Sequence, residues 1–214
     1  MQIEIHDHVF EMFPQKAVLW KNTNTLLISD LHLGKITHFR KEGIAVPSNA
    51  FGNNFSRLDE LMGTTNAERI ILLGDLFHNR HNEEWSRFEV WRNKYQSAEI
   101  IVVLGNHDIL PRSLYDGNQM FVLNEMREGP FIFSHHPGTN KDRDAYCFCG
   151  HVHPVYCLRS KARQQIKLPC FVFDKHEAIL PSFGVFTGGF ELERIGGRKL
   201  FVIAEDKILA INGQ

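Results

Sequence analysis

The stretch Thr25-Leu-Leu-Ile-Ser-Asp-Leu-His32 decides the fold of this chain, because a short apolar run is followed at once by an aspartate and a histidine. A run of this length, rich in leucine and isoleucine, predicts a buried strand. Asp30 and His32 then fall at its carboxyl end, where open α/β sheets place their ligand sites. One residue separates them, so on an extended segment both side chains would point to the same side.

The same arrangement recurs along the chain, with Asp, Asn or His after each apolar run. The further pairs of run and cluster are Arg69–Leu73 with Gly74-Asp75, Ile100–Leu104 with Gly105-Asn106-His107-Asp108, Phe131–Phe133 with Ser134-His135-His136, and Tyr146–Cys149 with Gly150-His151-Val-His153. These side chains are the oxygen and imidazole ligands of hard-to-borderline metal ions. Clusters on one sheet edge would supply ligands for two ions, which favours a two-metal centre that hydrolyses phosphate esters.

The pattern between the clusters predicts an α/β fold. Expected strands in the first half are Gln2–Ile5, Phe10–Phe13, Ala17–Trp20, Thr25–Ser29, Ile70–Leu73 and Ile100–Leu104, with helices from Pro47 to about Gly63 and over Glu83–Tyr95. Expected strands in the second half are Phe121–Leu123, Phe131–Phe133, Ala145–Cys149, Val155–Leu158, Lys167–Phe173 and Leu200–Ala204. The strand–helix alternation of the first half predicts a parallel βαβαβ unit. We expect a single domain over residues 1–214, with two sheets packed face to face and helices outside.

Composition narrows the function classes. The net charge is -1, from 24 basic and 25 acidic side chains, which argues against a protein that coats nucleic acid non-specifically. An enzyme that binds nucleic acid locally stays open, because metal ions would supply positive charge. No apolar run approaches the roughly 20 residues of a membrane span, and the N-terminus lacks the features of a signal peptide. We therefore expect a cytoplasmic protein without a membrane segment.

The cysteines are Cys147, Cys149, Cys157 and Cys170. Without a secretory signal, disulfides are not expected. A structural zinc site is the sharper alternative, but the spacing lacks the paired C-x-x-C knuckles of zinc ribbons. Cys147 and Cys149 are therefore expected on a buried strand.

The order D-x-H, G-D, G-N-H-D, a histidine after a strand and G-H-x-H resembles the calcineurin-like metallophosphoesterases. The resemblance implies a four-layer αββα sandwich. It also implies two metal sites that share a bridging Asp75: Asp30, His32, Asp75 and His153 for one ion, and Asp75, Asn106, His135 and His151 for the other. His107 would be the general acid or transition-state stabiliser beside the scissile phosphate, oriented by Asp108.

A narrower resemblance spans nearly the whole chain. Its motifs are Asp30-Leu-His-Leu-Gly-Lys35, His38-Phe-Arg40, Gly43–Pro47, Gly74-Asp-Leu-Phe-His78, His135-His-Pro137, Gly150-His-Val-His-Pro154 and Leu180–Gly189. These are similar to the bacterial DNA-ligase-associated metallophosphoesterases. That group implies a DNA-damage-response endonuclease or phosphodiesterase, encoded beside an ATP-dependent DNA ligase, a helicase and an exonuclease. The nitrogen and oxygen ligands suit manganese, iron or zinc better than calcium, and the resemblance leans to manganese.

Some positions keep two interpretations. Either His135 or His136 could be the ligand after Ser134; we favour His135, with His136 turned to the substrate. Lys35, His38, Arg40 and His78 would contact a phosphate or a DNA strand, or simply be solvated. Arg143 and the basic segment 159–167, expected to be a hairpin tip, carry the same ambiguity.

The leading hypothesis is a DNA phosphodiesterase or endonuclease in which a hydroxide that bridges two metal ions attacks phosphorus. The alternatives are a phosphodiesterase or pyrophosphatase for a small nucleotide, a protein phosphatase, and a non-catalytic metal-binding scaffold. A complete ligand set with His107 counts against the scaffold. An open groove rimmed by Lys35, Arg40 and Arg143 would favour DNA, whereas a pocket capped by Leu180–Gly189 would favour a small molecule.

Overall fold

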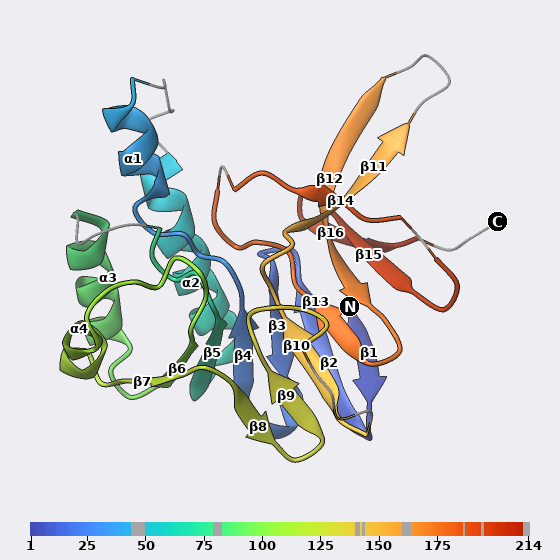
Figure 1. The fold of residues 1–214 in the computed structure, drawn as a ribbon, viewed down its shortest axis with the longest axis horizontal. Coiled ribbons are helices and arrows are strands. Elements are labelled where there is room, and N and C mark those ends of the chain that lie inside the picture. The colour runs from blue at the N-terminus through green and yellow to red at the C-terminus, as the bar shows by residue number, and fades with distance from the viewer. Residues whose placement is uncertain are drawn as a thin grey trace.

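Two β-sheets and a group of helices make up the protein (Figure 1). The structure is a computed structural model, and it describes residues 1–43, 50–78, 83–139, 142, 144–159, 164–185, 187–193 and 195–211. Within these residues, no helix combines the length and the apolar character needed to cross a bilayer.

The first sheet has seven strands that lie in chain order. They are β1 (Gln2–Ile5), β2 (His8–Phe13), β3 (Ala17–Trp20), β4 (Thr25–Ile28), β5 (Arg69–Leu73), β6 (Glu99–Val103) and β7 (Met120–Leu123). The strands β1 to β4 are antiparallel neighbours, and β4 to β7 run parallel. The helices of this half are α1 (Lys35–Lys41), α2 (Ala50–Thr65), α3 (Glu83–Lys94) and α4 (Arg112–Gly117), with a short 3-10 turn η1 (Lys21–Thr23). The predicted parallel βαβαβ order is confirmed, although the predicted helix start at Pro47 lies outside the described residues.

The second sheet is also mixed and has nine strands. They are β8 (Met126–Glu128), β9 (Phe131–Phe133), β10 (Tyr146–Cys149), β11 (Pro154–Arg159), β12 (Gln165–Phe173), β13 (Glu177–Ile179), β14 (Phe190–Glu191), β15 (Lys199–Ala204) and β16 (Lys207–Ala210). The order is β14-β11-β12-β13-β10-β9-β8, and β15 with β16 extends from β12. The strands β11 and β12 pair antiparallel from Arg159 and Gln165 inward, whereas residues 160–163, at the predicted hairpin tip, lie outside the described residues.

An aromatic core joins the two sheets. Phe10 and Trp20 from the first sheet contact Phe131 and Phe148 from the second, and all four side chains are buried. Such aromatic contacts bury large apolar areas and hold the sheets at one fixed separation. The docking of the sheets matters for function because each sheet supplies part of the polar clusters.

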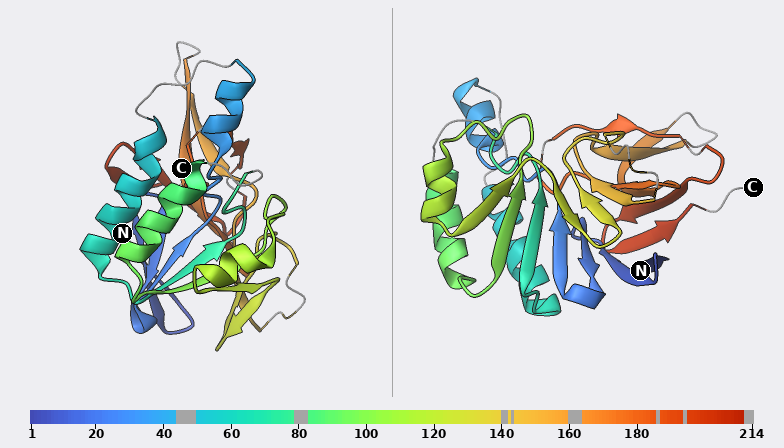
Figure 2. Two further views of the ribbon diagram at one scale, coloured as in Figure 1. Left: turned by 90° about the vertical axis from the view of Figure 1, so that its left-hand side faces the viewer. Right: turned by 60° about the horizontal axis from the view of Figure 1, so that its bottom comes forward.

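Helices cover the opposite face of the first sheet, on one side of the molecule (Figure 2). The aromatic side chains Trp85, Phe88 and Trp91 of α3 are buried there, against the sheet. The described residues place no helix on the outer face of the second sheet. That face instead holds the buried thiols of Cys147, Cys149 and Cys170 among aliphatic side chains, and the cysteines are unpaired. The predicted α/β sandwich of two mixed sheets is confirmed, with its described helices on one side only.

The inter-sheet core gives a stability prediction. Phe148 is fully buried, and its ring centroid lies 4.6 Å from that of Phe10. We expect Phe148→Ala to lower the free energy of unfolding by about 3–5 kcal/mol, because it removes a large buried ring and leaves a cavity. The control is Phe121→Ala on β7, where the ring is 60% exposed and the change should stay within about 0.5 kcal/mol. Urea unfolding measures both, and equal losses would contradict this view of the core.

Candidate metal centre

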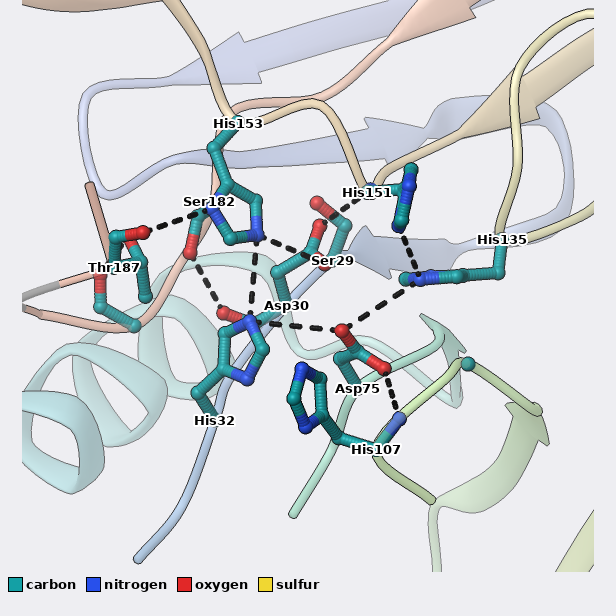
Figure 3. Close-up of polar contacts among 12 residues, drawn as sticks. Ser29, Asp30, His32, Asp75, His107, His135, His151, His153, Ser182 and Thr187 are labelled. Carbon is teal, nitrogen blue, oxygen red and sulfur yellow. Dashed lines mark hydrogen bonds and ion pairs between the residues drawn. The ribbon is translucent and has the colours of Figure 1, made fainter. Parts of the chain in front are cut away.

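The predicted polar clusters meet at one edge of the sandwich (Figure 3). The parallel strands β4, β5 and β6 lie in register, with Leu26 beside Ile70 and Ile70 beside Ile100. The residues that follow the three strands therefore emerge side by side. From the second sheet, the loops after β9 and β10 bring His135, His151 and His153 to the same place.

One group of side chains surrounds Asp30. His153 Nε2 lies 3.2 Å from Asp30 Oδ1 and 3.3 Å from His32 Nε2. His32 Nε2 in turn lies 3.7 Å from Asp75 Oδ2. The predicted first ligand set is thus gathered around a single point.

A second group lies on the other side of Asp75. His135 Nε2 is 3.6 Å from Asp75 Oδ2 and 3.1 Å from His151 Nδ1. Asp75 therefore stands between the two groups, where a bridging carboxylate would lie. Asn106 is in the adjoining loop, which is tied to Asp75 because the His107 backbone N–H donates to Asp75 Oδ1 over 2.8 Å.

The backbone at these positions is left-handed. Positive φ angles occur at Asp30 (53°), His32 (47°), Asp75 (52°), His151 (66°) and His153 (51°). The extended geometry that we expected for Asp30 and His32 is therefore wrong, because both residues bend the chain. Such conformations cost non-glycine residues about 1–3 kcal/mol each and cluster at functional sites.

The donor set fits divalent cations. Asp30 and Asp75 are buried, with 0% and 3% exposure, and the histidines face them. Burial and, to a lesser degree, nearby Lys35 lower the pKa of His32 to about 2, and burial with His135 lowers the pKa of His151. Neutral imidazoles cannot balance two buried carboxylates but can bind a metal ion with them. These nitrogen and oxygen donors could therefore hold two such ions.

Backbone carbonyls orient the histidine rings. His135 Nδ1 lies 2.9 Å from the carbonyl oxygen of Leu73, and His153 Nδ1 lies 3.1 Å from that of Thr187. When Nδ1–H donates to a carbonyl, the lone pair of Nε2 is free for a metal ion. In both residues Nε2 is the atom that faces the carboxylates.

The predicted catalytic residues lie at the rim of this group. The His107 ring packs against His32 and His78, with centroids 5.3 and 4.8 Å away. The Asp108 carboxylate accepts backbone N–H groups from Gly105, Leu76 and Phe77, and burial raises its pKa. Asp108 thus fastens the loop that carries His107 to the loop after β5.

The residues predicted to contact substrate are only partly brought together. Burial lowers the pKa of Lys35, while Asp75 and Asp30 partly offset this, so Lys35 lies near the carboxylates. His136 is exposed and its ring is 4.3 Å from that of His151, whereas His135 is buried; this arrangement favours His135 as the ligand. Arg40 is exposed on α1. The side chain of His38, all of Arg143 and residues 160–163 lie outside what the structure describes.

The segment after β13 is a contributor that we did not predict. Ser182 Oγ and the Gly184 N–H both donate to the backbone oxygen of Asp30, each over 2.9 Å, and Thr187 provides the carbonyl for His153. These contacts use backbone atoms and one small hydroxyl. No ligand-type residue in this segment signals them.

Comparison with known proteins decides the family. The sequence profile of the calcineurin-like phosphoesterases matches residues 23–165, more than half of the chain. The chain belongs to the calcineurin-like phosphoesterase family. The family resemblance is thereby confirmed, and this family member is a metal-dependent phosphoester hydrolase.

Two solved structures are reported for comparison, of which the first agrees with this assignment. The Pseudomonas putida nuclease MPE is 28% identical, covers 99% of each chain and superposes with a TM-score of 0.81. The phosphoesterase Yfce from E. coli is 13% identical over 88% of this chain and 99% of its own, with a TM-score of 0.45. No curated protein sequence gives a match.

Glycine 105 provides a test of the candidate centre. A Cβ on Gly105 would lie 2.3 Å from Asp75 Oδ1 and 2.4 Å from Asp75 N, so alanine must displace the central carboxylate. We expect Gly105→Ala to abolish the stabilisation of the protein by manganese, measured as the shift of the melting temperature on metal addition.

The matched control is Gly63→Ala in α2, where a Cβ would meet nothing within 4 Å. That change should retain the metal response and raise stability by about 0.5–1 kcal/mol, because alanine favours helix. An unchanged manganese response in Gly105→Ala would show that Asp75 is not at the centre of the site.

Proposed function

We propose that this protein is a two-metal phosphodiesterase that cleaves DNA as an endonuclease. The observation that carries the proposal is that predicted ligands from both sheets gather around the buried Asp75, with Asn106 in the adjoining loop; they are Asp30, His32, His135, His151 and His153. The similarity of the protein to a nuclease, over 99% of the chain, supports a nucleic-acid substrate. The narrower resemblance of the sequence supports a role in DNA repair, with an ATP-dependent DNA ligase, a helicase and an exonuclease encoded nearby as candidate partners, and we expect the protein to act in the cytoplasm.

Each ion would have its own ligands. Asp30, His32 and His153 would hold the first, Asn106, His135 and His151 the second, and Asp75 would bridge them. Manganese is our first choice among manganese, iron and zinc. Two bound divalent cations would lower the pKa of a water molecule between them and neutralise phosphoryl oxygens.

The chain's own side chains then handle the proton and the phosphate. His107 is beside the first group of ligands and would donate a proton to the leaving oxygen. The His78 ring packs against that of His107, and Lys35 lies near Asp75 and Asp30; both side chains would contact the non-bridging phosphate oxygens. His38, Arg40 and exposed His136 would reach flanking phosphates, the contacts that position a nucleic acid.

The surroundings of the site favour a polymer over a small nucleotide. Residues Leu180–Gly184, which would cap a closed pocket, are instead buried behind Asp30, where they bond its backbone. Helix α1 and the β11–β12 hairpin project on either side, beyond the strand ends that carry the ligands (Figure 1). The basic character of both elements suits a DNA backbone.

Hydrolysis assays test the proposal. With manganese present, we expect cleavage of bis-p-nitrophenyl phosphate in preference to the monoester, together with nicking of supercoiled plasmid. Both activities should be lost in Asp75→Ala, because that carboxylate serves both ions. Diester cleavage without nicking would indicate a small nucleotide substrate. Bound metal without any hydrolysis would indicate a scaffold.

The role of His107 can be separated from metal binding. We expect His107→Ala to lower kcat by about 10²–10⁴-fold, because the general acid is lost, while manganese affinity stays within a few-fold of wild type. Steady-state kinetics and calorimetric manganese titration measure the two effects. A variant with wild-type kcat would refute the assignment of His107.

A further inference from the structure

Residues 180–185 and 187 form a strap, which is the name we use for this segment between β13 and β14. It contacts two ligands of the first ion site through backbone atoms and one hydroxyl. Ser182 Oγ and Gly184 N bond the Asp30 carbonyl, and the Phe183 N–H donates to the carbonyl of Ser29 over 2.9 Å. The Thr187 carbonyl accepts a hydrogen bond from His153 Nδ1–H. The strap therefore fixes both the left-handed turn at Asp30 and the ring orientation of His153.

The strap is itself held from helix α2 by one side chain. The Arg57 Nη2 donates to the carbonyl of Phe183, and the guanidinium carbon lies 4.2 Å from the centroid of the Phe183 ring. The same Nη2 donates to Asn54 Oδ1 over 2.8 Å, and Asn54 is buried. Arg57 thus binds the middle of the strap through a hydrogen bond and a cation–π contact.

Stability alone does not account for an arginine at this place. Burial lowers the pKa of Arg57 to about 10, and its Nε is buried without a hydrogen-bond partner. The pKa of neighbouring Lys16 is lowered to about 8 by burial and by the charge of Arg57. Arg57 is half-buried beside a second cation, and the charge of Glu60 offsets this only in part, so an apolar side chain would fill the space at lower cost. An apolar side chain could not donate a hydrogen bond to the Phe183 carbonyl, so that contact with the strap would be lost.

We propose that Arg57 is a positioning residue for the metal ion held by Asp30 and His153, and that it acts through the strap. This inference rests on the proposed two-ion site. The effect should be specific to one ion, because His135 is oriented by the Leu73 carbonyl and Asp75 by the loop of His107, outside the strap.

Manganese titration tests the inference without use of catalysis. We expect wild type to bind two ions and Arg57→Ala to bind one of them about 10–100-fold more weakly, the usual cost of losing an outer hydrogen-bonding partner of a ligand. Arg57→Lys should be intermediate, because one ammonium cannot match the planar guanidinium in contact with Phe183 and Asn54 together. Hydrogen exchange at the Phe183 and Gly184 amides should be faster in Arg57→Ala.

Single-site backgrounds identify the affected ion. In His135→Ala, which keeps the first site, adding Arg57→Ala should weaken the remaining ion by the same factor. In His32→Ala, which removes a ligand of the first site and keeps the bond from the His151 backbone N–H to Asp30 Oδ2, adding Arg57→Ala should leave the affinity of the second ion unchanged. The matched control is Arg92→Ala. Arg92 is a buried arginine that donates to the backbone carbonyls of Asn118 and Tyr95, away from the strap.

The outcomes separate this inference from the proposed function. A wild-type protein that binds fewer than two manganese ions would overturn the two-ion site itself. Two ions in wild type with unchanged affinities in Arg57→Ala would overturn only the role of Arg57, which would then be structural like Arg92. If Arg57→Ala does not fold, Arg57→Lys decides: weakened binding of one ion supports the inference, and unchanged binding of both overturns it.

Discussion

The burial of two carboxylates at the ends of neighbouring strands is the constraint on which the rest of the structure depends. Asp30 and Asp75 are withdrawn from water among imidazole rings, and burial lowers the pKa of one of these rings, that of His32, so the cluster is unfavourable without cations. The surrounding chain holds them there. Glycines at 74, 105 and 150 leave no room for a Cβ beside His135, Asp75 and Asp30. The packing is thus fitted to the cluster, so the carboxylates cannot relax into solvent.

Backbone pairing compensates for the strained conformations of these residues. After β4 and β5 end, their loops remain paired: Asp30 N–H donates to the Gly74 carbonyl, His32 N–H to that of Asp75, and Leu33 N–H to that of Leu76. Leu33 and Phe77 form a last bridge beyond the strands. Two left-handed turns therefore run side by side and support each other. A loop with this many internal hydrogen bonds is preorganised, which lowers the entropic cost of binding an ion.

The sequence predicted the polar side chains that the structure gathers at the sheet edge, because each is a distinctive residue after a recognisable apolar run. Central strands such as β5 and β6 were predicted to within a residue for the same reason. What it did not predict has no such pattern. The strands β8, β13, β14 and β16 each include a charged residue, so no uninterrupted apolar run marks them. The strap acts through backbone carbonyls, which every residue possesses. Arg57 is one polar residue in an amphipathic helix, so the sequence predicts that it is solvated, and only the fold shows that Phe183 packs against it. Left-handed turns at Asp30 and His32 follow from the pairing of two loops, which no local pattern encodes.

The division of ligands between the sheets links metal binding to the fold. The first sheet carries Asp30, His32, Asp75 and Asn106, and the second carries His135, His151 and His153. On the proposed assignment neither half holds a complete site, so ions would bind tightly only when the aromatic interface has brought the sheets together. By linkage, each ion stabilises the docked sheets by about 2.7 kcal/mol at a free concentration one hundred times its Kd. The interface core would therefore determine metal affinity as much as the ligands do. The binding of the metal would in turn offset part of the cost of the strained backbone at Asp30, Asp75 and the histidines.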